Sequence, residues 1–374
     1  MIGTRYIGVP TQKGGAIEFL SFELAKALAS TGFNITYYSI LSEKKEEPRI
    51  KNLSVIRFPR KKTNGLAFNL FVFFNALKKD FDLVYLSASS MLPAALLLSK
   101  IKRIPLVYHE FNHNPWIGGK DFLFDFLSKE SVKASDLTVT PSLFIKNKII
   151  ESIPSAKEKV IPILHSLDLN EFPKRIPGKE KKIVFVGRIL EHKGIHYLIE
   201  SMKELSKTNP EWVLSVIGPK GEFNKISNKY FSRIKKMIKD FGLEKKIVFK
   251  GQLLRKELIK ELSTSSLLVF PSSEEAFGLV LIEANTCWTP CIAFDSGATK
   301  EIIEHNKNGF IVNKGNQKEL TEMILKLVKD KNLMKRFFIN SRKTAEEKFA
   351  LNKRIGEWIK YLNIKDSRNN SLKG

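Results

Sequence analysis

The chain has 374 residues, enough for two or three domains, and 43% of them are hydrophobic and 27% charged. This composition excludes a collagen, a disulfide scaffold and a wholly disordered chain. The 63 Lys and Arg against 39 Asp and Glu give a net charge of +24, which requires an anionic partner such as nucleic acid, a membrane surface or a phosphorylated substrate. Cys287 and Cys291 form a pair without further Cys or His neighbours, which is a poor zinc site, and we expect buried free thiols. No leader and no apolar run of about 20 residues is visible, so we expect a cytoplasmic protein.

Strand-like and helix-like segments alternate through the first half of the chain. A strand is predicted at residues 6–9, and the helix after it has apolar residues at four-residue spacing and ends near Gly32. Further strands are predicted at 35–40, 53–58, 83–86, 106–109, 137–140 and 160–162. This alternation predicts a parallel sheet with helices on both faces.

A second series of strands and helices follows a charged, proline-containing linker at 174–182. Its strands are predicted at 183–186, 213–217, 247–249, 267–270 and 291–294, and residues 320–362 are predicted to be helical. We therefore expect an α/β protein of two Rossmann-like, doubly wound domains. Ligands in such folds bind at the carboxyl ends of the strands, and the default site is the cleft between the domains.

The strand at 183–186 runs into a glycine turn that carries two cations. Gly187-Arg188 is followed five residues later by Lys193-Gly194, which opens a helix. A guanidinium, an ammonium and a helix N-terminus over one loop suit a diphosphate. The alternative interpretation is a surface loop that is merely charged.

Two glutamates separated by seven residues follow the strand at 267–270. Glu275 precedes a predicted helix and Glu283 lies two turns into it, about 12 Å further along. A carboxylate at each end can accept hydrogen bonds from the hydroxyls of a sugar and of a ribose. Backbone N–H groups at the helix start, those of Phe277, Gly278 and Leu279, can face a phosphate. The alternative is one glutamate favoured by the helix dipole and one solvated glutamate.

Together these motifs resemble the retaining glycosyltransferases of family four, also described as glycosyl transferases group 1, which have the GT-B fold. The similarity covers most of the chain. It also includes Gly14-Gly15 with Glu18, residues 134–136, Ser142, Asp168, Gly297 with Glu301, and residues 308–310. It implies metal-independent hexose transfer, without a cofactor, from a nucleotide-diphosphate sugar to a glycan or lipid-linked acceptor with retained configuration. UDP- and GDP-sugars are the favoured donors.

The resemblance also implies a role for individual residues. Arg188 and Lys193 would hold the diphosphate and stabilise its charge as it leaves. Glu275 would contact the donor sugar and Glu283 the ribose, and His109, at a strand end, would lie beside the reacting centre. The other expected donor-site residues are Gly14, Gly15, Gly187, Ala276, Phe277, Gly278 and Leu279.

The family's domain plan places acceptor binding in residues 1–172 and nucleotide-sugar binding in 173–345. Residues 346–362 would form a helix that crosses back to the first domain, and 363–374 a disordered tail.

Four departures from the family pattern concern loops near these motifs. The loop 162–168 is longer than usual and lacks an Asn-Gly turn, and Gly297-Ala298 replaces a Gly-Gly pair. Ala276 stands where Gly is usual, which is tolerated if its φ is negative. Trp288 also replaces a Gly, and we expect its turn to be reshaped because Trp does not readily adopt a left-handed conformation.

The pair Asp80-Phe81-Asp82 matches the metal motif of another class of glycosyltransferases. It precedes a predicted strand, where Asp is common in turns, and we expect no metal there.

Basic residues flank an aromatic-rich helix in the first half of the chain. Residues 57–62 contain four Lys or Arg residues, residues 66–77 are mostly apolar, and Lys78-Lys79 follow. This pattern indicates either an anionic membrane surface as partner, with the protein peripheral on its cytoplasmic face, or a helix whose Phe71 and Phe74 cover the sheet while the cations face water. The second interpretation is favoured for most of the helix.

Other functions compatible with the sequence are a catalytically inactive GT-B relative, a sugar epimerase or phosphorylase of the same fold, and a basic nucleic-acid-binding protein. The chain shows no recognisable nucleic-acid-binding module, so we expect no nucleic-acid partner.

Overall fold

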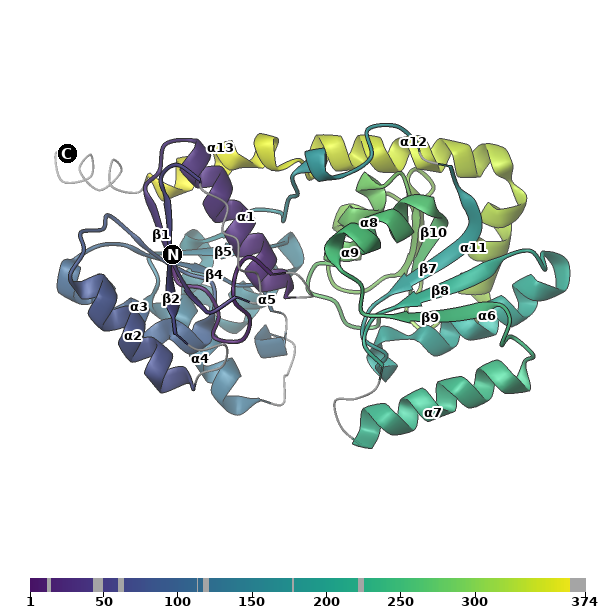
Figure 1. The fold of residues 1–374 in the computed structure, drawn as a ribbon, viewed down its shortest axis with the longest axis horizontal. Helices are drawn as coiled ribbons and strands as arrows, with labels where there is room; N and C mark the ends of the chain where they lie inside the picture. Colours follow the sequence, from purple (N-terminus) through teal and green to yellow (C-terminus); the bar gives the residue numbers. More distant parts are fainter. Residues whose placement is uncertain are drawn as a thin grey trace. The chain divides into compact units, whose positions relative to one another are not determined.

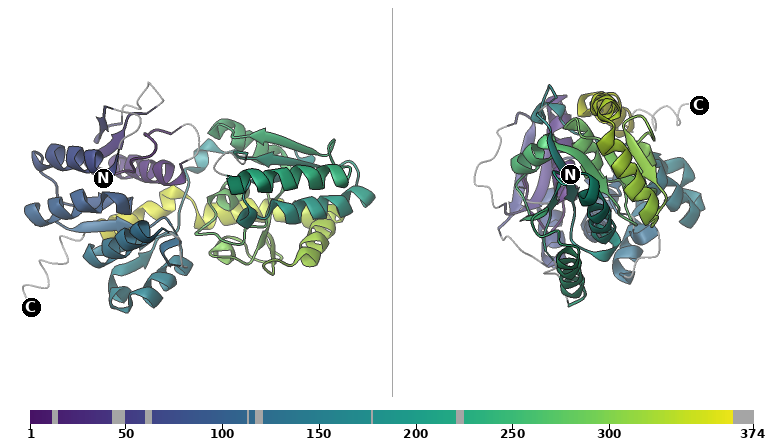
Figure 2. Two further views of the ribbon diagram at one scale, coloured as in Figure 1. Left: turned by 90° about the horizontal axis from the view of Figure 1, so that it is seen from below. Right: turned by 90° about the vertical axis from the view of Figure 1, so that its right-hand side faces the viewer.

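The computed structural model describes residues 1–11, 15–42, 50–59, 64–112, 114–116, 121–176, 178–220 and 225–363. The chain divides into two compact units, one formed by Met1–Asp168 with Leu351–Gly374 and the other by Leu169–Ala350. Each unit is a parallel sheet with its own helices (Figures 1 and 2). The predicted tail lies outside the described residues except for Asn363.

The first unit contains a four-stranded sheet and a strand pair. The sheet has the order β3 (Val84–Leu86), β4 (Leu106–His109), β5 (Leu137–Thr140), β6 (Val160–Pro162), and the pair is β1 (Ile35–Ile40) with β2 (Leu53–Phe58). Its helices are α1 (Ala16–Ser30), α2 (Gly65–Leu77), α3 (Leu92–Lys102), α4 (Phe122–Ala134), α5 (Leu143–Ser152) and α13 (Leu351–Leu362). The apolar runs of the sequence therefore identified these strands within a residue.

The strand predicted at residues 6–9 is wrong. The sheet position belongs instead to the first residues of the chain, where Ile2 bridges both Tyr38 in β1 and Leu86 in β3. The Ile2 N–H donates to the Tyr85 carbonyl at 2.8 Å, and the Gly3 N–H donates to the Tyr38 carbonyl at 3.0 Å. Because these backbone groups are already paired by residues 1–3, the apolar run at 6–9 passes outside the ladder.

The second unit is built on a six-stranded sheet. Its order is β12 (Gly309–Val312), β11 (Cys291–Phe294), β10 (Ser265–Phe270), β7 (Glu180–Val186), β8 (Val213–Ile217), β9 (Ile247–Gly251). Its helices are α6 (Ile195–Thr208), α7 (Lys225–Asp240), α8 (Arg255–Thr264), α9 (Leu279–Thr286), α10 (Thr299–Ile302), α11 (Gln317–Lys329) and α12 (Lys331–Lys348). The main core joins the strands to residues of α6, α7, α11 and α12. Helices α8 and α9 pack against each other and against β10, and α12 packs against α9 (Figure 1).

Two features of this unit differ from the sequence prediction. β12 was missed, because it is a short strand that begins with Gly309 and follows a turn rather than a long apolar run. The helical stretch predicted at 320–362 is three helices, and Asp330 separates the first two by capping α12 through the Leu333 N–H at 2.8 Å. Both cysteines are buried free thiols, as predicted.

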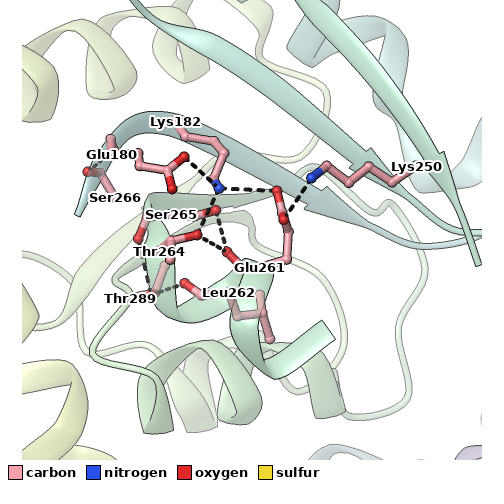
Figure 3. Close-up of polar contacts among 9 residues, drawn as sticks. All are labelled: Glu180, Lys182, Lys250, Glu261, Leu262, Thr264, Ser265, Ser266 and Thr289. Carbon is pink, nitrogen blue, oxygen red and sulfur yellow. Dashed lines mark hydrogen bonds and ion pairs between the residues drawn. The ribbon is translucent and has the colours of Figure 1, made fainter. Parts of the chain in front are cut away.

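The amino-terminal edge of this sheet holds a buried charge network (Figure 3). The Lys182 ammonium lies 2.9 Å from Glu180 and 3.2 Å from Glu261, and donates to the Thr264 hydroxyl at 2.8 Å. Lys250 pairs with the other oxygen of Glu261 at 2.9 Å. A buried lysine is tolerated in β7 because its three donors all meet acceptors, and the network ties β7, β9 and α8 together.

Candidate functional site

The strand order of the second unit changes direction at β7 and β10. The chain runs from β7 outward to β8 and β9, then returns to the other side of β7 to form β10, β11 and β12. Ligands of open α/β sheets bind outside the carboxyl ends of the strands at such a point. Gly187-Arg188 follows β7 there, and the segment 271–278 follows β10, so the two predicted motifs leave the sheet side by side.

Lys193 and Glu275 meet at this switch point. The Lys193 ammonium lies 2.9 Å from a carboxylate oxygen of Glu275, and both side chains are largely buried, with 15% and 17% of their surface exposed. The same ammonium lies 3.5 Å from the Ser272 hydroxyl and 5.8 Å from the ring centre of Phe270. Two residues 82 positions apart are therefore held as one charged pair with a small exposed surface.

Two glycines allow the loops around this pair to approach closely. Gly194, at φ 71°, lies so near the loop after β10 that a Cβ would be 2.0 Å from the Pro271 carbonyl oxygen. Gly297, at φ 57°, lies so near the Glu275 backbone that a Cβ would be 1.7 Å from its carbonyl oxygen. Both positions thus require glycine for conformation and for space.

The loop after β7 carries a second cation and a histidine. Arg188 is exposed, and its charge together with that of Lys193 adds to burial in lowering the pKa of His192, while Glu274 and Glu275 oppose this. Sequence reasoning passed over His192, whose carbonyl oxygen accepts the Ser273 N–H at 2.8 Å and so fastens this loop to the one after β10. The only sequence signal for it is its place beside Lys193.

The segment after Glu275 leads into α9. The helix begins at Leu279 with Gly278 as its N-cap, and Ala276 and Phe277 before it are buried. The first amide groups of a helix have no carbonyl partner inside it, which makes this end a place where an anion can bind. Ala276 is not among the described non-glycine residues with positive φ, so its replacement of glycine is tolerated as expected.

Glu283 is buried inside the unit rather than solvated. It is 6% exposed, and one of its carboxylate oxygens accepts from Arg255 at 2.8 Å. The same guanidinium pairs with Glu171 at 2.8 Å. Burial raises the pKa of Glu283, and the charge of Arg255 opposes that rise. Arg255 was missed by sequence reasoning because it is one basic residue among many.

Trp288 corrects one expectation. We expected its turn to be reshaped to avoid a left-handed residue, yet Trp288 has φ 59°. The indole N–H donates to the Pro173 carbonyl at 3.1 Å, and the guanidinium of Arg342 lies 5.8 Å from its ring centre. Such strain persists where the surroundings hold it, and these two contacts supply that support.

In the first unit, His109 lies at the carboxyl end of β4 and is 3% exposed. Its Nδ1 lies 2.5 Å from the Tyr85 hydroxyl, and Trp358 of α13 packs 5.0 Å from its ring. Among the described residues Nε2 has no partner, and His109 is one of the residues that line a pocket of about 20 Å³, room for one water molecule. Burial, followed by the charge of His165, holds the pKa of His109 well below its usual range, so the ring is neutral.

The loop that carries the N-terminal glycine motif lies in the same unit. Gly15 is the N-cap of α1, and Glu18 in the first turn is buried and accepts from the Thr4 hydroxyl. Gly14, and His113 after β4, lie outside the described residues.

The Asp80-Phe81-Asp82 segment lies before β3, at the edge of the sheet away from His109. It borders a cavity of about 700 Å³, and Asp80 lies 3.9 Å from the Lys102 ammonium. Within the described part of the chain, no three His, Cys, Asp or Glu side chains gather as a metal site.

Comparison with known proteins identifies the family. The model for "Glycosyltransferase Family 4" matches residues 17–170 and that for "Glycosyl transferases group 1" matches residues 168–344. The chain belongs to the group 1, family 4 type glycosyltransferases. An uncharacterized glycosyltransferase of Haemophilus influenzae is 25% identical over 360 residues, covering 92% of this chain and 95% of its own.

Solved glycosyltransferases share the GT-B fold with this chain. Sucrose-phosphate synthase of Thermosynechococcus elongatus has a TM-score of 0.82 at 18% identity and covers 98% of both chains. HepE of Anabaena in complex with UDP-glucose has a TM-score of 0.73 at 20% identity and covers 94% of this chain and 97% of its own. The predicted fold class is thereby confirmed.

Proposed function

We propose that this glycosyltransferase moves a hexose from a nucleotide-diphosphate sugar to a glycan or lipid-linked acceptor, with retained configuration and without a metal. The observation that carries the proposal is the Lys193–Glu275 pair at the switch point of the second unit. The pair joins a cation suited to a phosphate with a carboxylate suited to sugar hydroxyls. The UDP-glucose complex of the structurally similar HepE makes a UDP-sugar our preferred donor, with a GDP-sugar next.

In the proposed reaction the bond between the anomeric carbon and the donor phosphate oxygen breaks, and its electron pair stays on the diphosphate. Lys193 and Arg188 stabilise that charge as it develops, and the N-terminus of α9 contributes its amide groups. The acceptor hydroxyl bonds to the anomeric carbon on the face that the diphosphate leaves, and its proton passes to the departing phosphate. We assign the neutral His109 to acceptor recognition.

Turnover tests this proposal directly. The protein is incubated with UDP- and GDP-hexoses and a membrane-lipid extract, with EDTA present, and the anomeric signals of released or transferred sugar are followed by NMR. An α-linked donor giving an α-linked product supports the proposal, and an inverted product contradicts it. Absence of turnover with every donor favours the inactive relative.

We also propose that the acceptor is met at the anionic cytoplasmic face of a membrane. No helix of the described residues is long and apolar enough to span a bilayer. α2 and α3 pack against each other (Figure 1). Each exposes a stripe of apolar side chains. The stripes consist of Leu66, Leu70, Phe74 and Leu77 on α2 and of Leu97 and Ile101 on α3.

The side-chain burial of α2 confirms the favoured sequence interpretation for Phe71 and corrects it for Phe74. Phe71 packs against Phe58 of β2, with ring centroids 5.3 Å apart, whereas Phe74 is 58% exposed and does not cover the sheet. Exposed Lys78, Lys79, Lys100 and Arg103 lie at the ends of the two helices. Apolar stripes beside cations match a surface with anionic headgroups over hydrocarbon.

Vesicle sedimentation checks this surface. The protein should bind vesicles containing anionic phospholipid at low salt, and Leu70→Glu with Phe74→Glu should reduce the bound fraction at least tenfold. Ile339→Glu is the matched control, since Ile339 is a 46% exposed apolar residue of the other unit. Equal binding by wild type and the double variant would contradict the assignment.

A further inference from the structure

The two carboxylate oxygens of Glu283 have different surroundings. One oxygen, Oε1, accepts from the Arg255 guanidinium at 2.8 Å, and for the other oxygen no partner is found among the described residues. The side chain is 8% exposed. A carboxylate this buried is stable only with a cation or several donors beside it, so its ionised form depends on Arg255.

Arg255 is itself held in place from three directions. Its Nε donates to Glu171 at 2.8 Å, its guanidinium carbon lies 5.5 Å from the ring centre of Phe172, and its backbone begins α8. The two carboxylates it bridges come from segments more than a hundred residues apart. A planar guanidinium fixed in this way orients the carboxylate that it binds, which a flexible ammonium would do less well.

The electrostatics agree with this geometry. Burial raises the pKa of Glu283 first of all, Arg255 lowers it, and Glu171 raises it slightly further. Loss of Arg255 would therefore favour the protonated, neutral carboxyl. A neutral carboxyl accepts hydrogen bonds from a diol less strongly than a carboxylate does.

We propose that Arg255 is a positioning residue for recognition of the donor's ribose. It keeps Glu283 ionised and turns its second oxygen toward the ribose hydroxyls. This inference rests on the proposed function and on the ribose contact that the family resemblance implies for Glu283. It adds that this chain depends on Arg255 for that contact.

Binding of nucleoside diphosphates tests the proposal. Affinities for UDP and GDP and for their 2′-deoxy forms are measured by calorimetry for wild type, Glu283→Gln, Arg255→Gln and Arg255→Lys. Wild type should favour the ribose form by about tenfold or more, the cost of leaving one charge-assisted hydrogen bond unmade. Glu283→Gln and Arg255→Gln should both lose most of that preference, and Arg255→Lys should restore part of it.

Glu171→Gln is a graded comparison, because it removes one of the contacts that hold Arg255 and leaves the Arg255–Glu283 pair in place. It should weaken the ribose preference less than Arg255→Gln does. In Arg255→Gln the ribose preference should also weaken further as the pH falls, because a carboxyl with a raised pKa becomes neutral toward lower pH. Melting curves show whether each variant is folded. If Arg255→Gln does not fold, Arg255→Lys takes its place in the binding test.

The outcomes separate this inference from the proposed function. Full ribose preference in folded Arg255→Gln or Arg255→Lys, with loss in Glu283→Gln, overturns only the positioning role of Arg255. Full preference in Glu283→Gln overturns the ribose contact and the positioning role together. Absence of any binding by wild type contradicts the proposed function itself.

Discussion

Replacing Lys193 by alanine should reduce transfer about a hundred- to thousandfold, the range found when one preorganised donor to a developing anion is removed. The ammonium is 2.9 Å from Glu275 and only partly exposed, so we expect it to bind the diphosphate with little competing water. The measurement is kcat/KM with the donor identified by turnover. Most of the loss should lie in kcat, because the charge on the leaving diphosphate grows in the transition state.

The matched control is Lys207→Ala. Lys207 also pairs with a glutamate, Glu204, at 2.8 Å, but on the surface of α6, with 59% of its side chain exposed. That variant should retain wild-type turnover. Near-normal turnover by folded Lys193→Ala would show that the pair is a structural salt bridge.

Gly297→Ala should destabilise the second unit by about 3 kcal/mol or more, because left-handed backbone strain and a steric overlap act together. A Cβ there would lie 1.7 Å from the Glu275 carbonyl oxygen, so the loop that carries Glu275 must move. Donor affinity should fall with stability. Urea unfolding followed by circular dichroism measures the first effect, and calorimetry with UDP the second.

Gly315→Ala isolates the contribution of backbone conformation. Gly315 has φ 77°, but a Cβ there would meet only the Tyr197 hydroxyl oxygen, at 3.6 Å. The Gly315→Ala variant should lower the free energy of unfolding by about 1 to 2 kcal/mol, the strain of one left-handed residue. Donor binding should be unchanged. Similar losses in both variants would contradict the role given to the close approach at Gly297.

The sheet was largely predictable because strands of a parallel sheet are buried on both faces. β4 and β8, for example, are mostly apolar and lack alternating polar residues. Their first and last residues were therefore predicted correctly. The sheet pairing of residues 1–3 and of β12 was not predicted, because each is a short segment whose pairing depends on its neighbours in space. Local sequence carries little signal for such partners.

The location of the candidate-site residues was predictable where a motif joins a strand end to a helix start, as at Lys193 and Glu275. Contacts that depend on tertiary packing were not predictable. Arg255 reaches Glu283 only because α8 and α9 lie together, and Trp358 reaches His109 only because α13 belongs to the first unit. Trp288 shows the reverse case, in which a backbone preference was overridden by two contacts from distant residues.

Thermal-shift binding to nucleotide sugars, with EDTA present, tests the central claim most directly. The panel consists of UDP-, GDP- and ADP-hexoses, the free nucleotides and a DNA duplex, against wild type and Arg188→Ala. A ligand at a hundred times its Kd should raise the Tm by about 5–10 °C. We predict that one nucleotide sugar produces this shift and that Arg188→Ala reduces it. No shift with any nucleotide sugar, together with salt-sensitive stabilisation by the DNA, would contradict the account.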